Sequence, residues 1–517
     1  MTKRDEEYKP LLFTTTIRNP ERIKTFLSVI AKYNGQALTN KVIDQIVYDL
    51  VSMKEYVPMY VHRKSSLKSK LNSEEPFSDS ETRDIILHSP QNHKEAGFEE
   101  GWPSRFDTWY KFLKELGFVY YEMYKPIEMS EAGNNLVLAN NEGFEHLEQQ
   151  VFLSSFAKYQ RDNPYRRISN RNKPLILLLQ TILELRKKLG PSNAGVTVSE
   201  VPLFICWKDD NYKELANQII KIRKACGFTP SDEYIYAICK QILNLKTKDE
   251  KRFKISNICH EMPDEFIRKM RMTGLISIRG GGRFVDINNQ ELEKVKYVID
   301  NYSQLMTFKT EREYFDYVKS MDLKLVSLSK AASVSEQENR KLFIKWVDEF
   351  DLETLIKELI IVSDNRLSSK HAMFKFINEP LRLEFLTALA LQKKFTNIVV
   401  KPNYSSDDEG MPTSFAPGNA PDITCLDQTG NVLFEVTLMK GRQQVANEMI
   451  PIERHLTEVK QNDQQAFSVF LAPTIHPDAI RYSEFAKFKT GTEIIPIEIA
   501  TFANELAAKA NIRSYKA

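Results

Sequence analysis

The stretch PGNAPDITCLDQTGNVLFEVTLMK, residues 417–440, predicts a β-hairpin from which the C-terminal fold can be worked out. Residues 428–431 would form a four-residue loop between two strands. Asp422 then faces Thr437 and lies diagonal to Glu435. Because side chains alternate between the two faces of a strand, these two acids share one face. The other face is apolar and suits packing against a helix.

The two acids on this hairpin predict a metal site. Like charges at this separation repel each other unless a cation or a proton neutralises them. The pair is within reach of one ion held about 2.1 Å from each oxygen, and carboxylate oxygens suit Mg²⁺, with Mn²⁺ as a substitute. We therefore expect Asp422 and Glu435 to hold Mg²⁺. An ordinary solvated hairpin face would show the same alternation, so periodicity alone leaves that alternative open.

Around this hairpin, predicted strands alternate with predicted helices. The short, wholly apolar run 467–471 favours a strand that is buried on both faces. Such alternation is typical of an α/β unit. The predicted elements are helices over 380–393, 447–462, 478–487 and 501–510, and strands over 397–400, 423–426, 432–438, 467–471 and 493–498.

One supersecondary pattern occurs twice in residues 1–300. In each copy an amphipathic helix ends at a glycine, Gly117 or Gly274, and two short strands follow. The second copy turns at residues 280–282, three glycines that tolerate conformations other residues avoid. A helix, a glycine stop and a hairpin form the outline of a winged helix. The predicted strand pairs are 118–121 with 127–129, and 275–278 with 284–287.

Together these patterns predict a multidomain α+β protein. Two winged-helix-like subdomains would precede a charge-rich helical linker and a C-terminal α/β domain. The linker contains an amphipathic stripe over residues 351–361. The predicted boundaries are 1–160 and 161–304 for the two subdomains, 305–370 for the linker and 371–517 for the C-terminal domain.

The composition excludes several classes of protein. The chain of 517 residues is 42% hydrophobic and 27% charged, which excludes global disorder. No apolar run reaches the roughly 18 residues of a membrane-spanning helix, and the charged N-terminus leads into no apolar signal segment. The five dispersed cysteines fit neither a disulfide framework nor a zinc site. We therefore expect a cytoplasmic protein without a membrane partner.

Basic residues gather at two places that predict contacts with nucleic acid, although the net charge of +3 decides nothing by itself. The polar stretch 159–174 is expected to be an exposed loop or a domain joint, and cations flank the glycine turn of the second hairpin. Such cations can reach phosphates, but a solvated basic loop would look the same. The candidate DNA-binding residues are Arg166, Arg167, Arg171, Lys173, Arg279 and Arg283.

A resemblance to a known family sharpens this interpretation. A proline directly before Asp422, followed by Glu435 inside an apolar strand, resembles the acid pattern of the PD-(D/E)xK nuclease fold. The wider context resembles the catalytic domain of AlwI-type type IIS restriction endonucleases and their site-specific nicking relatives, and the likeness extends over most of the chain. The segments that carry it are GNAPD at 418–422, FEVT at 434–437, EMIPIERH at 448–455 and the opening NPERI at 19–23.

The resemblance implies a role for four acids. Asp422 and Glu435 would hold the metal, which would polarise the phosphate and activate a water. Glu448 on the next helix and Glu384 on the first helix of the domain would be further catalytic acids. An acid on an amphipathic helix is often merely solvated, so both helical acids keep that alternative.

The group that activates water stays open. The usual lysine of the fold would stand at Thr437, and the resembled family also lacks it. Glu448 or Gln444 could orient the water instead. His455 fits a hydrogen-bonded structural residue better than a base.

The resemblance implies a type IIS restriction endonuclease of a restriction–modification system. It would recognise a short asymmetric sequence in double-stranded DNA and hydrolyse phosphodiester bonds a few base pairs to one side, with Mg²⁺ as cofactor. Because the sequence shows one acid hairpin, cutting both strands would need a second catalytic domain from another copy or a small subunit. The alternatives are a non-catalytic sequence-specific DNA-binding regulator and a structure-specific repair nuclease.

Overall fold

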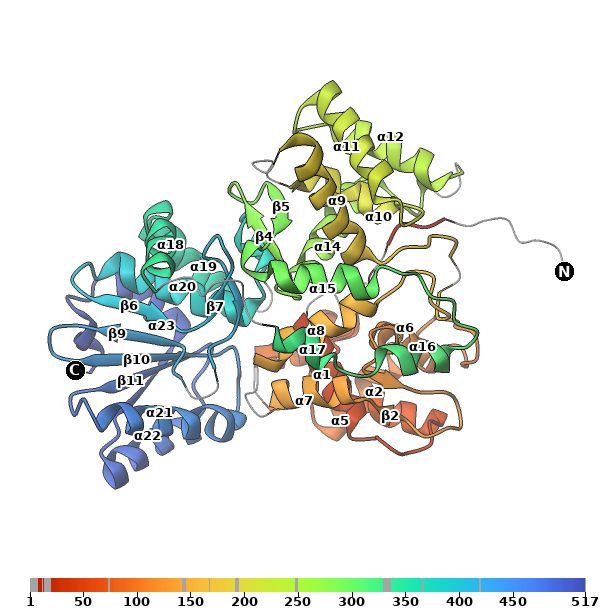
Figure 1. Ribbon diagram of the computed structural model, residues 1–517. Helices are drawn as coiled ribbons and strands as arrows, with labels where there is room; N and C mark the ends of the chain where they lie inside the picture. Colours follow the sequence, from red (N-terminus) through yellow and green to blue (C-terminus); the bar gives the residue numbers. More distant parts are fainter. Residues whose placement is uncertain are drawn as a thin grey trace. The chain divides into compact units, whose positions relative to one another are not determined.

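The computed structural model divides into two compact units, each described by itself (Figure 1). The N-terminal unit comprises residues 1–140 and 149–331, and the C-terminal unit comprises residues 141–148 and 332–517. Both contain helices and strands, so the chain is a multidomain α+β protein, as expected. The structure describes residues 8–11, 13, 20–72, 75–141, 146–166, 168–190, 195–246, 250–328, 336–364, 367–417 and 420–516.

The first part of the N-terminal unit is helical and leads into a short hairpin. Trp109 and Tyr110 of α6 are fully buried in an aromatic core. β1 pairs antiparallel with β2, with Val119 opposite Met129, so the first predicted hairpin is confirmed. The elements are α1 (Pro20–Ala31), α2 (Asn40–Ser52), α3 (Met59–Arg63), α4 (Ser65–Lys68), η1 (Ser69–Asn72), α5 (Asp79–Leu87), α6 (Trp102–Glu115), β1 (Val119–Tyr120), β2 (Glu128–Met129), α7 (Glu131–Asn141) and α8 (His146–Lys158).

The second part of this unit contains a three-stranded sheet in the order β3-β5-β4. β4 pairs antiparallel with β5, and Gly280, Gly281 and Gly282 turn between them with φ values of 61°, 65° and 93°, so the second predicted hairpin is also confirmed. The elements are α9 (Pro174–Leu189), β3 (Val196–Thr197), η2 (Val198–Glu200), α10 (Val201–Cys206), α11 (Tyr212–Cys226), α12 (Asp232–Leu243), η3 (Asn257–Glu261), α14 (Met262–Arg271), β4 (Ile276–Arg279), β5 (Phe284–Ile287), η4 (Asn289–Glu291), α15 (Leu292–Tyr302), α16 (Glu311–Val318) and α17 (Leu323–Ser327).

The described residues of the basic stretch 159–174 are mostly buried, so the expectation of an exposed loop is wrong, while the alternative of a domain joint stays a prediction. The side chains of Arg161, Asn170 and Asn172 are fully buried. Each donates a hydrogen bond to the carbonyl oxygen of Trp207, at distances of 3.0, 3.0 and 3.1 Å. Polar side chains can be buried when they satisfy backbone acceptors in this way, and a polar composition alone therefore did not indicate exposure.

A five-stranded sheet forms the centre of the C-terminal unit, in the order β12-β11-β10-β9-β6. β10, β11 and β12 run parallel, whereas β9 is antiparallel to both β10 and β6. In Figure 1, α21 and α22 cover one face of this sheet. The elements are α18 (Glu336–Glu349), α19 (Leu352–Ser363), η5 (Phe374–Phe376), α20 (Glu379–Lys394), β6 (Val399–Pro402), β7 (Ser405–Ser406), β8 (Pro412–Ser414), β9 (Ile423–Leu426), β10 (Asn431–Val436), η6 (Val445–Met449), α21 (Ile450–Lys460), β11 (Phe467–Ala472), α22 (Pro477–Thr490), β12 (Ile494–Glu498), α23 (Ile499–Leu506) and η7 (Ile512–Tyr515).

The α/β alternation of this unit was predicted correctly, but the hairpin register differs from the expected one by two residues. Phe434 pairs with Ile423 and Asn431 with Leu426, so the loop spans residues 427–430. The Oδ1 of Asp427 accepts hydrogen bonds from the amides of Thr429 and Gly430, at 2.7 and 3.0 Å. This side-chain turn draws Asp427 out of the strand and into the loop.

Helices of the predicted linker 305–370 fall in both units, because α16 and α17 belong to the N-terminal unit and α18 and α19 to the C-terminal unit. The four predicted domain boundaries stay a prediction. Across the described residues, none of the helices combines the length and the apolar character needed to cross a membrane.

Candidate active site

Asp422 and Glu435 lie directly opposite each other at the end of the β9–β10 hairpin. The amide of Asp422 donates to Oε2 of Glu435 at 3.2 Å, and the amide of Val436 donates to Oδ2 of Asp422 at 2.8 Å. These two bonds join both carboxylates to the ends of neighbouring strands. The acids therefore share one face of the hairpin, as predicted, but they are direct rather than diagonal neighbours because of the register.

The apolar residues around Glu435 fix the direction of its side chain. Leu433, two residues earlier on the same face, packs in a buried cluster with Phe470 of β11 and with Ile452 and Leu456 of α21. Because side chains alternate along a strand, this packing turns Glu435 toward the face that α21 covers. Glu435 is itself buried, with 6% of its surface exposed.

His455 of α21 completes the contacts of Glu435. Its Nδ1 lies 3.0 Å from Oε1 of Glu435, and both side chains are buried. A carboxylate can only accept, so Nδ1 carries the hydrogen and donates. On the other side of the ring, Nη2 of Arg454 lies 3.5 Å from Nε2. His455 is thus a hydrogen-bonded residue, as predicted, but its partner could not be predicted, because nothing in the sequence fixes how α21 is rotated over the sheet.

Glu384 and Glu448 lie near the same pair of acids. Glu384 is a buried residue of α20, and Glu448 is a half-buried residue of the π-helical turn η6. Burial is the main cause that raises the pKa of Asp422 well above its usual value. Repulsion from the other three acids raises it further, while the Val436 amide opposes the shift. The structure thus brings together all four acids that the sequence singled out.

A divalent cation fits this cluster by the chemistry of its donors. Oδ1 of Asp422 makes no hydrogen bond to the described part of the chain, so it is available to a ligand. No group of three or more carboxylate, imidazole or thiolate side chains among the described residues is arranged to hold a metal by itself. Mg²⁺ is usually bound through one or two carboxylates together with waters and substrate phosphates, which agrees with a site built on Asp422 and Glu435.

Gln444, a candidate for orienting the water, and Thr437, which stands at the position of the missing lysine, both have structural contacts. The Nε2 of Gln444 donates to the carbonyl oxygens of Met439 and Thr474, at 2.9 and 2.8 Å, and its Oε1 accepts from the amide of His476 at 2.9 Å. This buried amide has used its donors to hold neighbouring loops together. The hydroxyl of Thr437 accepts from the amide of Met439 at 3.0 Å.

Two of the candidate DNA-binding residues are engaged inside the N-terminal unit. The Nε of Arg166 lies 2.7 Å from Oε2 of Glu115, a carboxylate with 2% of its side chain exposed. Lys173 is also buried, and its amino group donates to the hydroxyl of Tyr317 at 3.2 Å. Burial lowers the pKa of Lys173 to about 8.

The other candidates differ in how much surface they present. Arg279 is 16% exposed and pairs with the buried Asp286 at 2.9 Å. Arg171 is 53% exposed in spite of a 2.8 Å contact with Asp162, and Arg283 is exposed at the tip of the second hairpin. Arg167 lies outside the described residues. The DNA-binding role of all six stays a prediction.

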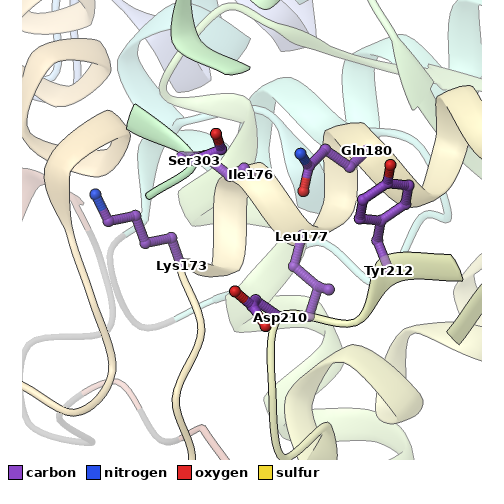
Figure 2. A pocket seen from close by; sticks show the side chains of 7 residues that line it. All are labelled: Lys173, Ile176, Leu177, Gln180, Asp210, Tyr212 and Ser303. Carbon is purple, nitrogen blue, oxygen red and sulfur yellow. The ribbon is translucent and has the colours of Figure 1, made fainter. Parts of the chain in front are cut away.

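A cavity of about 230 Å³ lies in the N-terminal unit, whereas the four acids belong to the C-terminal unit. In Figure 2 the amino group of Lys173 points away from Asp210 and Tyr212. The cavity therefore brings together no acids of the candidate site. Its lining residues are Lys173, Ile176, Leu177, Gln180, Asp210, Tyr212 and Ser303.

The solved structures that match this chain include three restriction endonuclease chains of low similarity. The small subunit R.BspD6I2 of the heterodimeric restriction endonuclease R.BspD6I is 24% identical, with a TM-score of 0.26, and the match covers 30% of this chain and 77% of that one. Restriction endonuclease FokI is 10% identical, with a TM-score of 0.24 over 99% of this chain and 97% of that one. FokI bound to DNA is 11% identical, with a TM-score of 0.22 over 98% and 96%. No curated protein sequence matches the chain.

Comparison with protein families gives a broader match. The sequence model of the AlwI restriction endonuclease family matches residues 114–355 and 337–504. These two segments together span most of the chain, including the second hairpin and all four acids. The chain therefore belongs to the AlwI restriction endonuclease family.

Proposed function

We propose that this restriction endonuclease is a type IIS enzyme that uses Mg²⁺, bound by Asp422 and Glu435, to hydrolyse DNA a few base pairs to one side of an asymmetric site. The observation that carries the catalytic part is the pair of hydrogen bonds by which the amide of Asp422 holds Glu435 and the amide of Val436 holds Asp422. Two more acids lie close by. Four acids at one place are costly to keep ionised without a cation.

Each residue of the site has a separate role in the proposed hydrolysis. Asp422 and Glu435 bind the cation, and His455 fixes Glu435 by its hydrogen bond. Glu448, which is near enough to Asp422 to raise its pKa, would orient the attacking water, since Thr437 stands where the fold usually has a lysine. When bound, Mg²⁺ would act as a Lewis acid on the phosphate and lower the pKa of a water.

Two winged-helix-like subdomains would recognise the DNA. The strand order β3-β5-β4 supports this proposal, because the first strand pairs with the last, and the hairpin of the last two strands would serve as the wing. In the first copy, Ala37 and Leu38 form isolated bridges to Pro126 and Met123, in the segment that connects β1 and β2.

Plasmid cleavage by matched variants tests the catalytic proposal. Asp422→Ala and Glu435→Ala should abolish cleavage in Mg²⁺, because each removes a ligand, while both variants still bind the plasmid in EDTA. Glu484→Ala, which removes an exposed acid of α22, is the control and should cut normally. Cleavage by Asp422→Ala at the rate of the unchanged protein would exclude the proposed metal site.

Mapping the cut ends separates the type IIS proposal from its alternatives. Ends at a constant offset from one asymmetric sequence support it, whereas scattered ends at branched or damaged DNA would indicate a repair nuclease. Failure of every preparation to cut would favour a DNA-binding regulator.

A second catalytic domain is proposed for cleavage of both strands, because a single acid hairpin serves one strand at a time. We expect the rate of double-strand cleavage per enzyme molecule to fall on dilution, whereas nicking of one strand should not depend on concentration. Simultaneous cutting of both strands at a rate per molecule that is unchanged by dilution would contradict this.

A further inference from the structure

Helix α11 presents a basic face to solvent, and the function described above does not use it. Its buried residues Leu215, Ala216, Ile219 and Ile222 lie on one side of the helix. With about 100° between successive residues, the opposite side carries Lys213, Asn217, Lys221 and Lys224. All four of these side chains are exposed. The side of α11 that faces away from the core therefore carries three lysines and one amide, with the exposed Glu214 at its edge, about 20° from Lys221.

These lysines differ from the other cation of the same helix. Arg223 is directed inward and pairs with the fully buried Glu200 at 2.7 Å. In contrast, Lys213, Lys221 and Lys224 make no ion pair with any carboxylate of the described residues. A paired arginine already has a structural role, whereas three unpaired lysines on one face keep their charge available to a partner.

The neighbouring helix adds to this basic surface. In Figure 1, α11 lies beside α9, and Nζ of Lys188 near the end of α9 donates to Oδ1 of Asn217 at 2.6 Å. This contact places the ammonium group of Lys188, which is also paired with Glu184 at 3.3 Å, at the middle of the lysine row. At a rise of about 1.5 Å per residue, the row from Lys213 to Lys224 is about 16 Å long.

We propose that this lysine face, defined by Lys213, Lys221 and Lys224, binds the phosphate backbone of double-stranded DNA. Duplex DNA carries about one negative charge per 1.7 Å of its axis, so a row of about 16 Å can meet several phosphates. DNA is the partner because the chain belongs to a restriction endonuclease family, and the inference does not depend on the proposed metal site. Lysine suits this role as a point charge that follows phosphates without reading bases.

The salt dependence of DNA binding tests the proposal. The full-length protein with Lys213→Gln, Lys221→Gln and Lys224→Gln is titrated with a labelled duplex that spans a cut site, in EDTA so that nothing is cleaved. Each phosphate contact contributes about 0.9 to the slope of log affinity against log salt. We expect the slope to become shallower by about 2.7 for the three contacts, with an unchanged melting temperature.

A charge-matched variant is the control. Lys41, Lys68 and Lys94 are also exposed and make no ion pair in the described part of the N-terminal unit. Changing these three lysines to glutamine removes the same net charge but should leave the slope unchanged. An equal change of slope in both triple variants, or in neither, would overturn the proposal. Should the first triple variant melt early, the three single variants replace it, each with an expected change of about 0.9.

Discussion

The charged residues buried in the N-terminal unit contrast with those of the C-terminal unit. In the former, Arg166 and Arg279 were predicted to meet DNA, but each is paired with a buried carboxylate of its own unit. In the latter, Asp422 and Glu435 were predicted to meet a metal, and they are grouped with other acids. Opposite charges buried together need no further explanation, whereas like charges buried together need a ligand.

The paired charges of the N-terminal unit therefore stabilise the fold, whereas the grouped acids of the C-terminal unit destabilise it when no ligand is bound. A buried ion pair leaves an uncompensated charge when one partner is removed. Removal of one acid from a group of acids reduces the electrostatic repulsion among the others. Substitutions in the two units should consequently change stability in opposite directions.

The largest effect is expected from Glu115→Ala in the N-terminal unit. Oε2 of Glu115 accepts from Arg166 at 2.7 Å and from the hydroxyl of Tyr159 at 3.1 Å. Its removal takes the carboxylate partner from a guanidinium that is only 17% exposed, so the free energy of unfolding in urea should fall by about 3–5 kcal/mol. Arg171→Ala, which breaks a pair whose arginine is 53% exposed, should change it by less than about 1 kcal/mol. Equal decreases in the free energy of unfolding of the two variants would show that burial does not strengthen the ion pair.

A smaller effect is expected from His455→Ala in the C-terminal unit. Glu435 loses the hydrogen bond that orients Oε1, and loss of such a partner typically lowers metal affinity or activity by about 10–100-fold. Both the cleavage rate and the rise in melting temperature on addition of Mg²⁺ should decrease. His455→Asn, whose amide can donate from nearly the same position as Nδ1, should restore part of both. A variant with normal metal affinity would refute the positioning role of His455.

The smallest effect, with the opposite sign, is expected from Asp422→Asn. Because the pKa of Asp422 is raised, the folded protein holds this proton more tightly than the unfolded chain. The free energy of unfolding of the wild type should therefore fall as the pH rises above about 4, the usual pKa of an aspartate. Without metal at about pH 8, the asparagine variant should be more stable than the wild type, because it carries no charge that burial and the neighbouring acids disfavour.

The same variant connects stability with the proposed metal. Added Mg²⁺ should raise the melting temperature of the wild type, because a ligand that binds the folded state stabilises it, but should leave Asp422→Asn unchanged. Thermal melts of both proteins with and without Mg²⁺, at about pH 4 and at about pH 8, measure this. A variant that melts below the wild type under all conditions would mean that Asp422 stabilises the fold.

The two hairpins of the N-terminal unit show how far a local sequence signal reaches. Residues 280–282 are glycines with positive φ, and the turn that they form was predicted. In the first hairpin the positive φ of 66° belongs to Tyr124, whose side chain is 74% exposed. A tyrosine does not signal this conformation, because non-glycine residues rarely adopt it. It is held there by tertiary hydrogen bonds, since the amide of Tyr124 donates to the carbonyl of Leu38 at 2.7 Å.

The sequence by itself determined which residues share a face, because alternation along a strand depends only on the order of residues. It thereby identified Asp422 and Glu435 as a pair, and the α/β alternation around them. Tertiary structure decided the rest: the turn at Asp427 set the register, and the rotation of α21 brought His455 to Glu435. It also decided that Arg166 is paired inside the protein, since only the packing of distant segments places a carboxylate 51 residues away against that arginine.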